Sequence, residues 1–207
     1  MRKTKEEAAI TRESLLQAAL AVFSRKGYTA ATLEDVARQA GVTRGAIYWH
    51  FGSKAELYTA LLSEYSARGG EIVQAAAAEG GSLVEILRRV FIRLLEAVES
   101  DAALRAVMDI SLFKTERTPE LAAAQHQQME NSHILLAGIA ETMHQGIAAG
   151  ALRSDLDPAE MARAFIAFQN GVMHLWLWDP AAFSLKDSAP RLAEIYLRGI
   201  LPQGGSG

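Results

Sequence analysis

The chain of 207 residues contains no cysteine, which excludes disulfide bonds, thiolate catalysis and cysteine-ligated metal sites. No stretch approaches the roughly 20 apolar residues that a membrane-spanning helix needs. The first residues, Met1–Glu7, are polar and charged, and no apolar run that could serve as a signal peptide follows them. These absences predict a cytoplasmic protein in a reducing compartment.

Charge is distributed unevenly along the chain. The formal net charge is −3, yet the residues through Glu56 carry nine Lys and Arg against six Asp and Glu, and the remainder carries twelve against eighteen. A basic head on an acidic body is typical of a small DNA-binding domain joined to a larger one. With so few charges, chance explains the asymmetry equally well, so evidence for DNA binding has to come from the sequence motifs.

Apolar residues recur at helical spacing along almost the whole chain. The first such stripe consists of Leu15, Leu16, Ala19, Leu20 and Phe23. Capping residues and glycines divide the rest into helices expected at about residues 32–40, 43–51, 53–65, 82–95, 101–113, 118–152, 157–178 and 190–200. No alternating strand pattern of useful length and no internal repeat occurs. We therefore predict an all-α fold of about nine helices.

A helix-turn-helix is predicted from Thr32 onward. Thr32 and Asp35 have the spacing of a capping box at the start of the first helix, whose apolar face contains Val36, Ala37 and Ala40. Gly41 supplies the left-handed residue that a short turn requires. Thr43 is expected to cap the second helix, and Ile47 to hold it against the first.

The outward positions of the second helix carry groups that suit a DNA major groove. Arg44 has the donors to bind guanine O6 and N7 bidentately, and Thr43 can reach a base edge or a phosphate. Small residues after Arg44 let the backbone approach the duplex. The predicted DNA-binding residues are Thr32, Thr43, Arg44, Gly45, Ala46, Tyr48, His50 and Lys54. Phosphate contacts are expected from Thr32, Tyr48, His50 and Lys54, and such contacts set position rather than read sequence.

The alternative for this segment is an ordinary helical hairpin whose Tyr-Trp-His-Phe cluster belongs to the core. Part of that alternative is expected to hold, because Trp49, Phe51 or both should pack inward. A core role fits poorly for the polar and cationic set on the same short helix, namely Thr43, Arg44, Tyr48 and His50. DNA binding is therefore the favoured interpretation.

The runs Gly41–Phe51 and Lys54–Leu57 resemble the signature of the TetR/AcrR family of transcriptional regulators, and within it the AcrR and TtgR group of local multidrug efflux repressors. Looser similarity extends to Arg2–Ala8, Thr11-Arg12, Gly171-Val172 and Trp176-Leu177. The resemblance implies a DNA-binding domain over residues 1–56 and a ligand-binding and dimerisation domain over residues 57–207. The implied function is that of a homodimeric repressor, released from a palindromic double-stranded operator by a hydrophobic small-molecule inducer.

The resemblance also implies an apolar inducer cavity among the middle helices. The residues mapped to it are Leu87, Phe91, Leu94, Met108, Leu112, Leu135, Ile139, Phe165, Ile166, Gln169 and Asn170. Plain core is the alternative for each apolar member. The amides of Gln169 and Asn170 favour a cavity, because a buried amide needs a hydrogen-bond partner that a ligand could supply. Leu112-Phe113 departs from the polar or histidine side chains of the efflux-repressor group, which favours a flat, apolar inducer.

The last two helices carry more apolar surface than one amphipathic face needs. This excess predicts a four-helix dimer interface, with close helix approach at Gly171. Its predicted residues are Phe168, Val172, Leu175, Trp176, Leu192, Ile195 and Tyr196. An intramolecular core is the alternative.

Two other classes of protein were weighed against a DNA-binding regulator. Glu130 and His133 have the Glu-x-x-His spacing of di-iron bundles, but Glu141 and His144 repeat it on the same predicted helix rather than on a facing one. We therefore expect no metal and no cofactor, and with no nucleophile constellation or phosphate-binding loop, no enzyme. A helical interaction module that has lost DNA binding would be indicated by loss of Arg44 or Tyr48, and both are present.

Overall fold

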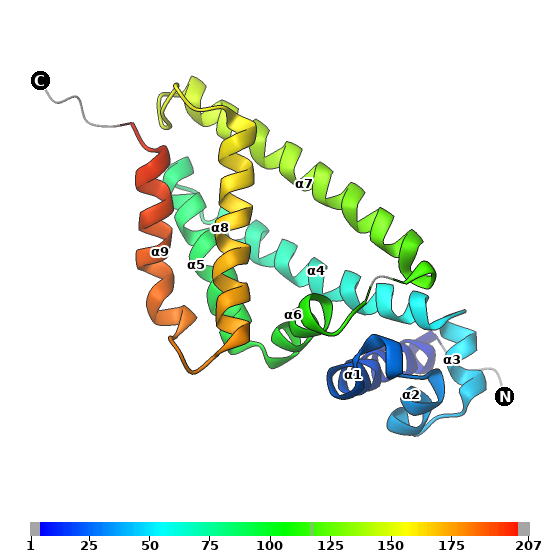
Figure 1. The fold of residues 1–207 in the computed structure, drawn as a ribbon. Coiled ribbons are helices and arrows are strands. Elements are labelled where there is room, and N and C mark those ends of the chain that lie inside the picture. The colour runs from blue at the N-terminus through cyan, green and yellow to red at the C-terminus, as the bar shows by residue number, and fades with distance from the viewer. Residues whose placement is uncertain (1–4, 117, 203–207) are drawn as a thin grey trace, which may run out of the picture. The chain divides into compact units, whose positions relative to one another are not determined.

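The computed structural model describes residues 5–116 and 118–202, with side chains from Arg12 onward. Within these ranges the chain forms nine α-helices, one 3₁₀ turn and no strand (Figure 1). The elements are α1 (Lys5–Ala30), α2 (Leu33–Ala40), α3 (Arg44–His50), α4 (Lys54–Ala78), α5 (Leu83–Ser100), α6 (Ala102–Phe113), η1 (Pro119–Leu121), α7 (Ala122–Ala148), α8 (Pro158–Trp178) and α9 (Leu185–Ile200). The prediction of an all-α fold of about nine helices is confirmed.

Two compact units are present. One contains the described residues up to Arg68 together with Ala102–His126, and the other contains Gly69–Asp101 together with the described residues from Gln127 onward. The helices α4 and α7 each contribute residues to both units. This is a division by compactness, and the functional division at residue 56 stays a prediction.

The first unit is built on α1, which packs against α2 and α6. Its core holds the predicted stripe of α1 together with residues of the following helices, among them Val36, Ile47, Leu57, Leu61 and Ile110. Gly27 interrupts α1 with φ 74° and ψ 170°. At that kink the amide of Tyr28 donates to the carbonyl oxygen of Lys114 at 2.9 Å, which ties the end of α1 to the segment after α6.

In the second unit α5 packs against α9 and α8, and Figure 1 shows α8 and α9 running side by side. Four aromatic rings from α5, α8 and α9 contact one another in this unit. Phe91 stacks on Phe168 with centroids 5.8 Å apart and meets Phe165 edge-on at 5.9 Å, and Phe165 contacts Tyr196 at 5.2 Å. The Tyr196 hydroxyl donates to the carbonyl oxygen of Met161 at 2.7 Å, so this buried phenol has a partner.

Two predicted helix starts differ from the structure. Thr43 occupies the N-cap position of α3, but its side chain makes no capping hydrogen bond. The last helix was expected after Pro190 and instead begins at Leu185, with the proline inside it. Its first turn forms earlier because Ser184 accepts from the amide of Asp187 at 3.1 Å, and the carboxylate of Glu99 accepts from the amide of Lys186 at 2.6 Å.

Candidate nucleic-acid interface

The local sequence holds α2 and α3 in a fixed relation. Thr32 Oγ1 accepts from the amide of Asp35 at 3.1 Å and the Asp35 carboxylate accepts from the amide of Thr32 at 3.2 Å, which completes the predicted capping box. Gly41 ends α2 with φ 68° and ψ 28°, the left-handed conformation that favours glycine. Ile47 is fully buried in the core and anchors α3. The predicted helix-turn-helix geometry is therefore present.

The free face of α3 is polar, aromatic and cationic. Thr43, Arg44 and Gly45 are exposed, and the side chain of Tyr48 is 45% exposed. Ala46 and His50 are half-buried. Because Ile47 and Phe51, four residues apart, take the buried side of the segment, Tyr48 and Trp49 between them face solvent, while His50 is half-buried.

The sequence predicts that Trp49, Phe51 or both pack inward. Phe51 is 4% exposed, as that expectation has it, whereas Trp49 is 72% exposed and lies edge-on to the ring of His50 at 4.6 Å. The exposed indole adds an apolar surface and an N–H donor to the solvent-facing side of α3. Helical spacing could have predicted that Trp49 is exposed, because Ile47 and Phe51 form the i, i+4 pair that packs inward and Trp49 lies outside that pair.

Arg44 and Tyr48 are bonded to each other across one helical turn. Arg44 Nη2 donates to the Tyr48 hydroxyl oxygen at 2.9 Å, and the guanidinium carbon lies 5.4 Å from the centroid of the phenol ring. This hydrogen bond raises the pKa of Arg44 above its already high ordinary value, so the guanidinium stays charged. The two side chains form one polar unit on the exposed face.

The hydroxyl of Thr32 already has a partner. Thr32 Oγ1 donates to Asp35 Oδ2 at 2.9 Å, and Lys26 Nζ lies 2.7 Å from Asp35 Oδ1. Hydrogen bonds from Lys26 and Thr32 lower the pKa of Asp35 to about 2. A phosphate contact from the Thr32 hydroxyl, as the sequence suggests, would have to replace its bond to this carboxylate.

Lys54 points back into the protein. Its ammonium group donates to the carbonyl oxygens of Tyr28 at 3.1 Å and Ala31 at 3.1 Å, with Thr29 at 3.4 Å, and it lies 4.3 Å from the centroid of the Tyr28 ring. These are carbonyls at the C-terminal end of α1, where a cation is favoured by the helix dipole. The geometry indicates a helix cap, and the phosphate contact of Lys54 stays a prediction.

Comparisons with known proteins match the helix-turn-helix segment and most of the remaining chain. Residues 15–61 match the bacterial regulatory proteins of the tetR family, and residues 83–201 match the C-terminal region of MAATS-type transcriptional repressors. The regulator AcrR of Shigella flexneri is 34% identical over 97% of this chain and 94% of its own length. TtgR of Pseudomonas putida is 32% identical over 89% of each chain.

The chain belongs to the TetR family. It is therefore a DNA-binding transcriptional regulator and not an enzyme. Among solved structures it is similar to NalD, described as the secondary repressor of a multidrug efflux pump in Pseudomonas aeruginosa, with a TM-score of 0.86, 27% identity and coverage of 97% of this chain and 100% of NalD. It is also similar to SmeT in complex with triclosan, with a TM-score of 0.81, 28% identity and coverage of 94% and 93%.

The residues predicted to line the inducer cavity differ in how deeply they are buried and in which of the two units they belong to. In the second unit Leu87, Phe91, Phe165 and Gln169 are buried, Leu94, Ile139 and Ile166 are half-buried, and Leu135 and Asn170 are exposed. Met108 and Leu112 belong to the first unit, where Leu112 lines a cleft of about 570 Å³ with Arg25 and Lys114. Gln169 Nε2 donates to the carbonyl oxygen of Phe91 at 3.2 Å. The amide nitrogen therefore has a partner within the protein.

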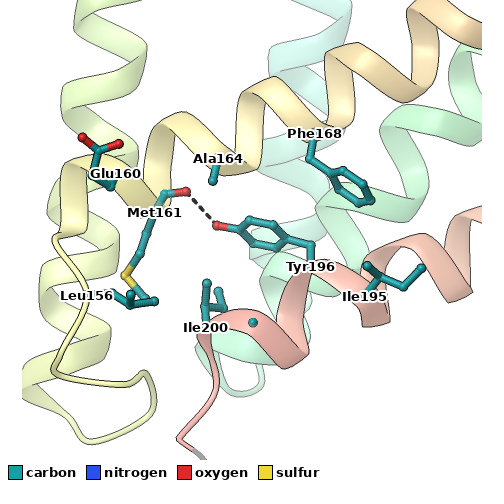
Figure 2. A pocket seen from close by; sticks show the side chains of 9 residues that line it. Leu156, Glu160, Met161, Ala164, Phe168, Ile195, Tyr196 and Ile200 are labelled. Atoms are coloured by element: carbon teal, nitrogen blue, oxygen red, sulfur yellow. Dashed lines mark hydrogen bonds between the residues drawn. The ribbon is translucent and has the colours of Figure 1, made fainter.

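The predicted dimer residues divide between the inside and the outside of the second unit. Val172, Trp176 and Tyr196 are buried, Phe168 and Leu192 are half-buried, and Leu175 and Ile195 are 60% and 63% exposed. Trp178, which the prediction omitted, is 76% exposed. An apolar pocket of about 430 Å³ is formed by α8, α9 and the segment before α8 (Figure 2), and it is lined by Leu156, Glu160, Met161, Ala164, Phe168, Ile195, Tyr196, Gly199 and Ile200.

Among the residues that the structure describes, no three His, Asp or Glu side chains gather as metal ligands. Glu130 and His133 are both exposed on α7. In the same described ranges, no helix combines the length and apolar character that crossing a membrane requires.

Proposed function

We propose that this TetR-family regulator is a homodimeric repressor that leaves a palindromic operator when a hydrophobic small molecule binds its second unit, and that it controls drug-export genes. The observation that carries the DNA-binding part is the exposed face of α3, where Arg44 and Tyr48 stand free of the core while Ile47 anchors the helix. The export part is supported by similarity to NalD and SmeT.

Sequence reading is assigned to Arg44 and Thr43 at the N-terminus of α3. A guanidinium at this position can take two acceptors of one guanine, which discriminates that base by about 1–3 kcal/mol. The lack of a side chain at Gly45 and the small one at Ala46 let the helix enter the groove closely. Tyr48, Trp49 and His50 would border the phosphate backbone and set the register.

Dimerisation is assigned to the outer face of α8 and α9. Leu175, Trp178 and Ile195 are large apolar side chains that remain more than half exposed within one chain. Exposed apolar side chains grouped on one face mark association surfaces, and a two-fold axis would pair this face with itself. Two α3 helices would then reach successive major grooves of a palindrome.

Ligand control requires that the inducer bind one conformer of the dimer more tightly than the other. A molecule of the size and apolarity of triclosan, which SmeT binds, suits a site near the aromatic cluster of Phe91, Phe165 and Phe168. We place the site there rather than at the amides, because the Gln169 nitrogen is already bonded and Asn170 is exposed.

The test is a fluorescence-anisotropy titration of the protein against the duplex just upstream of its own coding sequence and against a random duplex. Tight binding to the first, reversed by triclosan or another hydrophobic drug in proportion to its concentration, is the expected result. Equal binding to both duplexes would contradict the sequence-reading part. Operator binding that no hydrophobic drug reverses would contradict only the ligand part.

A further inference from the structure

The polar pair on α3 suggests a role for the phenol beyond a phosphate contact. Arg44 Nη2 donates to the Tyr48 oxygen at 2.9 Å, so the oxygen serves as an acceptor and its own O–H remains a donor. A phosphate oxygen accepts from O–H groups, and a guanine edge accepts from a guanidinium. One tyrosine hydroxyl can therefore contact the backbone and the base-reading arginine at the same time.

We propose that Tyr48 is the positioning residue that sets the orientation in which Arg44 reads its base. This inference rests on the proposed function. The phenol holds the guanidinium from its side, by the hydrogen bond and by the ring face 5.4 Å away, and leaves the remaining N–H donors of Arg44 for a base. When the Tyr48 O–H donates to a DNA phosphate, the position of Tyr48 on the DNA backbone is fixed. The hydrogen bond from Arg44 to the Tyr48 oxygen then fixes the orientation of Arg44 as well.

The surroundings of the pair support this assignment. Both side chains are exposed, so no packing from neighbouring helices fixes the Arg44 rotamer. An exposed arginine loses side-chain conformational entropy when it is held for a bidentate contact with a base. A partner one helical turn away already restricts the arginine in the free protein, so less entropy is lost on binding DNA. Arg38 on α2 forms ion pairs with Glu34 at 3.7 Å and with Asp35 at 3.9 Å, so it is a cation of the same unit that takes no part in the Arg44–Tyr48 hydrogen bond.

The test compares Tyr48→Phe with the wild type on a panel of operator duplexes in which each base pair of one half-site is changed in turn. The ring stays and only the hydroxyl is lost. The wild type should discriminate at the base pair read by Arg44 by about five- to a hundredfold. Tyr48→Phe should reduce that ratio about threefold or more, the effect of one ordinary hydrogen bond, and leave the ratios at other positions unchanged. Arg38→Gln is the matched control and should weaken all duplexes alike.

A double-mutant cycle with Arg44→Lys isolates the pair, because lysine lacks the guanidinium fork. In that background Tyr48→Phe should leave the base ratios unchanged. In the free protein, rotation of the Arg44 guanidinium followed by ¹⁵N NMR should be slower in the wild type than in Tyr48→Phe, a readout that needs no DNA. Uniform loss of affinity on every duplex, or equal guanidinium rotation in the two proteins, would overturn the positioning role while leaving DNA binding intact. A wild type that discriminates among no duplexes would overturn both.

Discussion

Replacing Lys54 with methionine should lower the free energy of unfolding by about 2 kcal/mol, because a hydrogen bond to a charged group contributes about 1.5–3 kcal/mol. The change keeps the aliphatic stem and removes the ammonium group, which donates to the carbonyls of Tyr28 and Ala31 at 3.1 Å each. Lys54 is half-buried, so solvent reaches the site and places the loss in the lower part of that range.

The assay is urea unfolding followed by circular dichroism at one protein concentration, with Lys186→Met as the matched control. Lys186 is exposed at the start of α9, and its replacement should leave the midpoint unchanged. Operator affinity is measured in parallel at several salt concentrations, since each phosphate contact adds about 0.9 to the slope of log K against log salt. A Lys54→Met protein with wild-type stability and a slope reduced by that amount would refute the capping role and restore the phosphate contact.

Two further predictions concern acid stability and assembly. The pKa of Asp35 is lowered to about 2, so its ionised form stabilises the fold above about pH 4 and this contribution disappears as the pH falls through 2. Asp35→Asn should therefore lower Tm at pH 6, and its Tm should fall less between pH 4 and 2 than that of the wild type. An equal fall of Tm in the two proteins over this range would contradict the prediction. Leu175→Glu should yield monomers in analytical ultracentrifugation, whereas Ile134→Glu, on an exposed position of α7, should not; a dimeric Leu175→Glu protein would move the interface elsewhere.

The parts of the site that the sequence predicts are those made by residues close together in the chain. The capping box of Thr32 and Asp35 spans three residues, and the turn at Gly41 depends on the conformation of one. The inward position of Ile47 follows from helical spacing alone. Local geometry of this kind is determined by short-range sterics and hydrogen bonds, and it is enough to bring Arg44 to the surface.

The parts that sequence reasoning misses depend on contacts between distant residues. The hydrogen bonds of Lys54 are one case, because the fold brings the end of α1, more than twenty residues earlier, against its ammonium group. The hydrogen bond of Gln169 is a second case, because its amide meets the Phe91 carbonyl only where α8 packs on α5. The early start of α9 depends in the same way on Glu99, which accepts from the amide of Lys186. No periodicity in one helix reveals its partner on another.

The central claim is that the exposed face of α3 reads DNA sequence through Arg44, and binding of Arg44→Ala to operator and to random duplex at the same ionic strength tests it most directly. Loss of a bidentate guanine contact costs about 1–3 kcal/mol on the operator, while random DNA loses only the general attraction of one charge. The account predicts that the ratio of operator to random affinity falls about five- to a hundredfold. An unchanged ratio, with both affinities lowered equally, would contradict it.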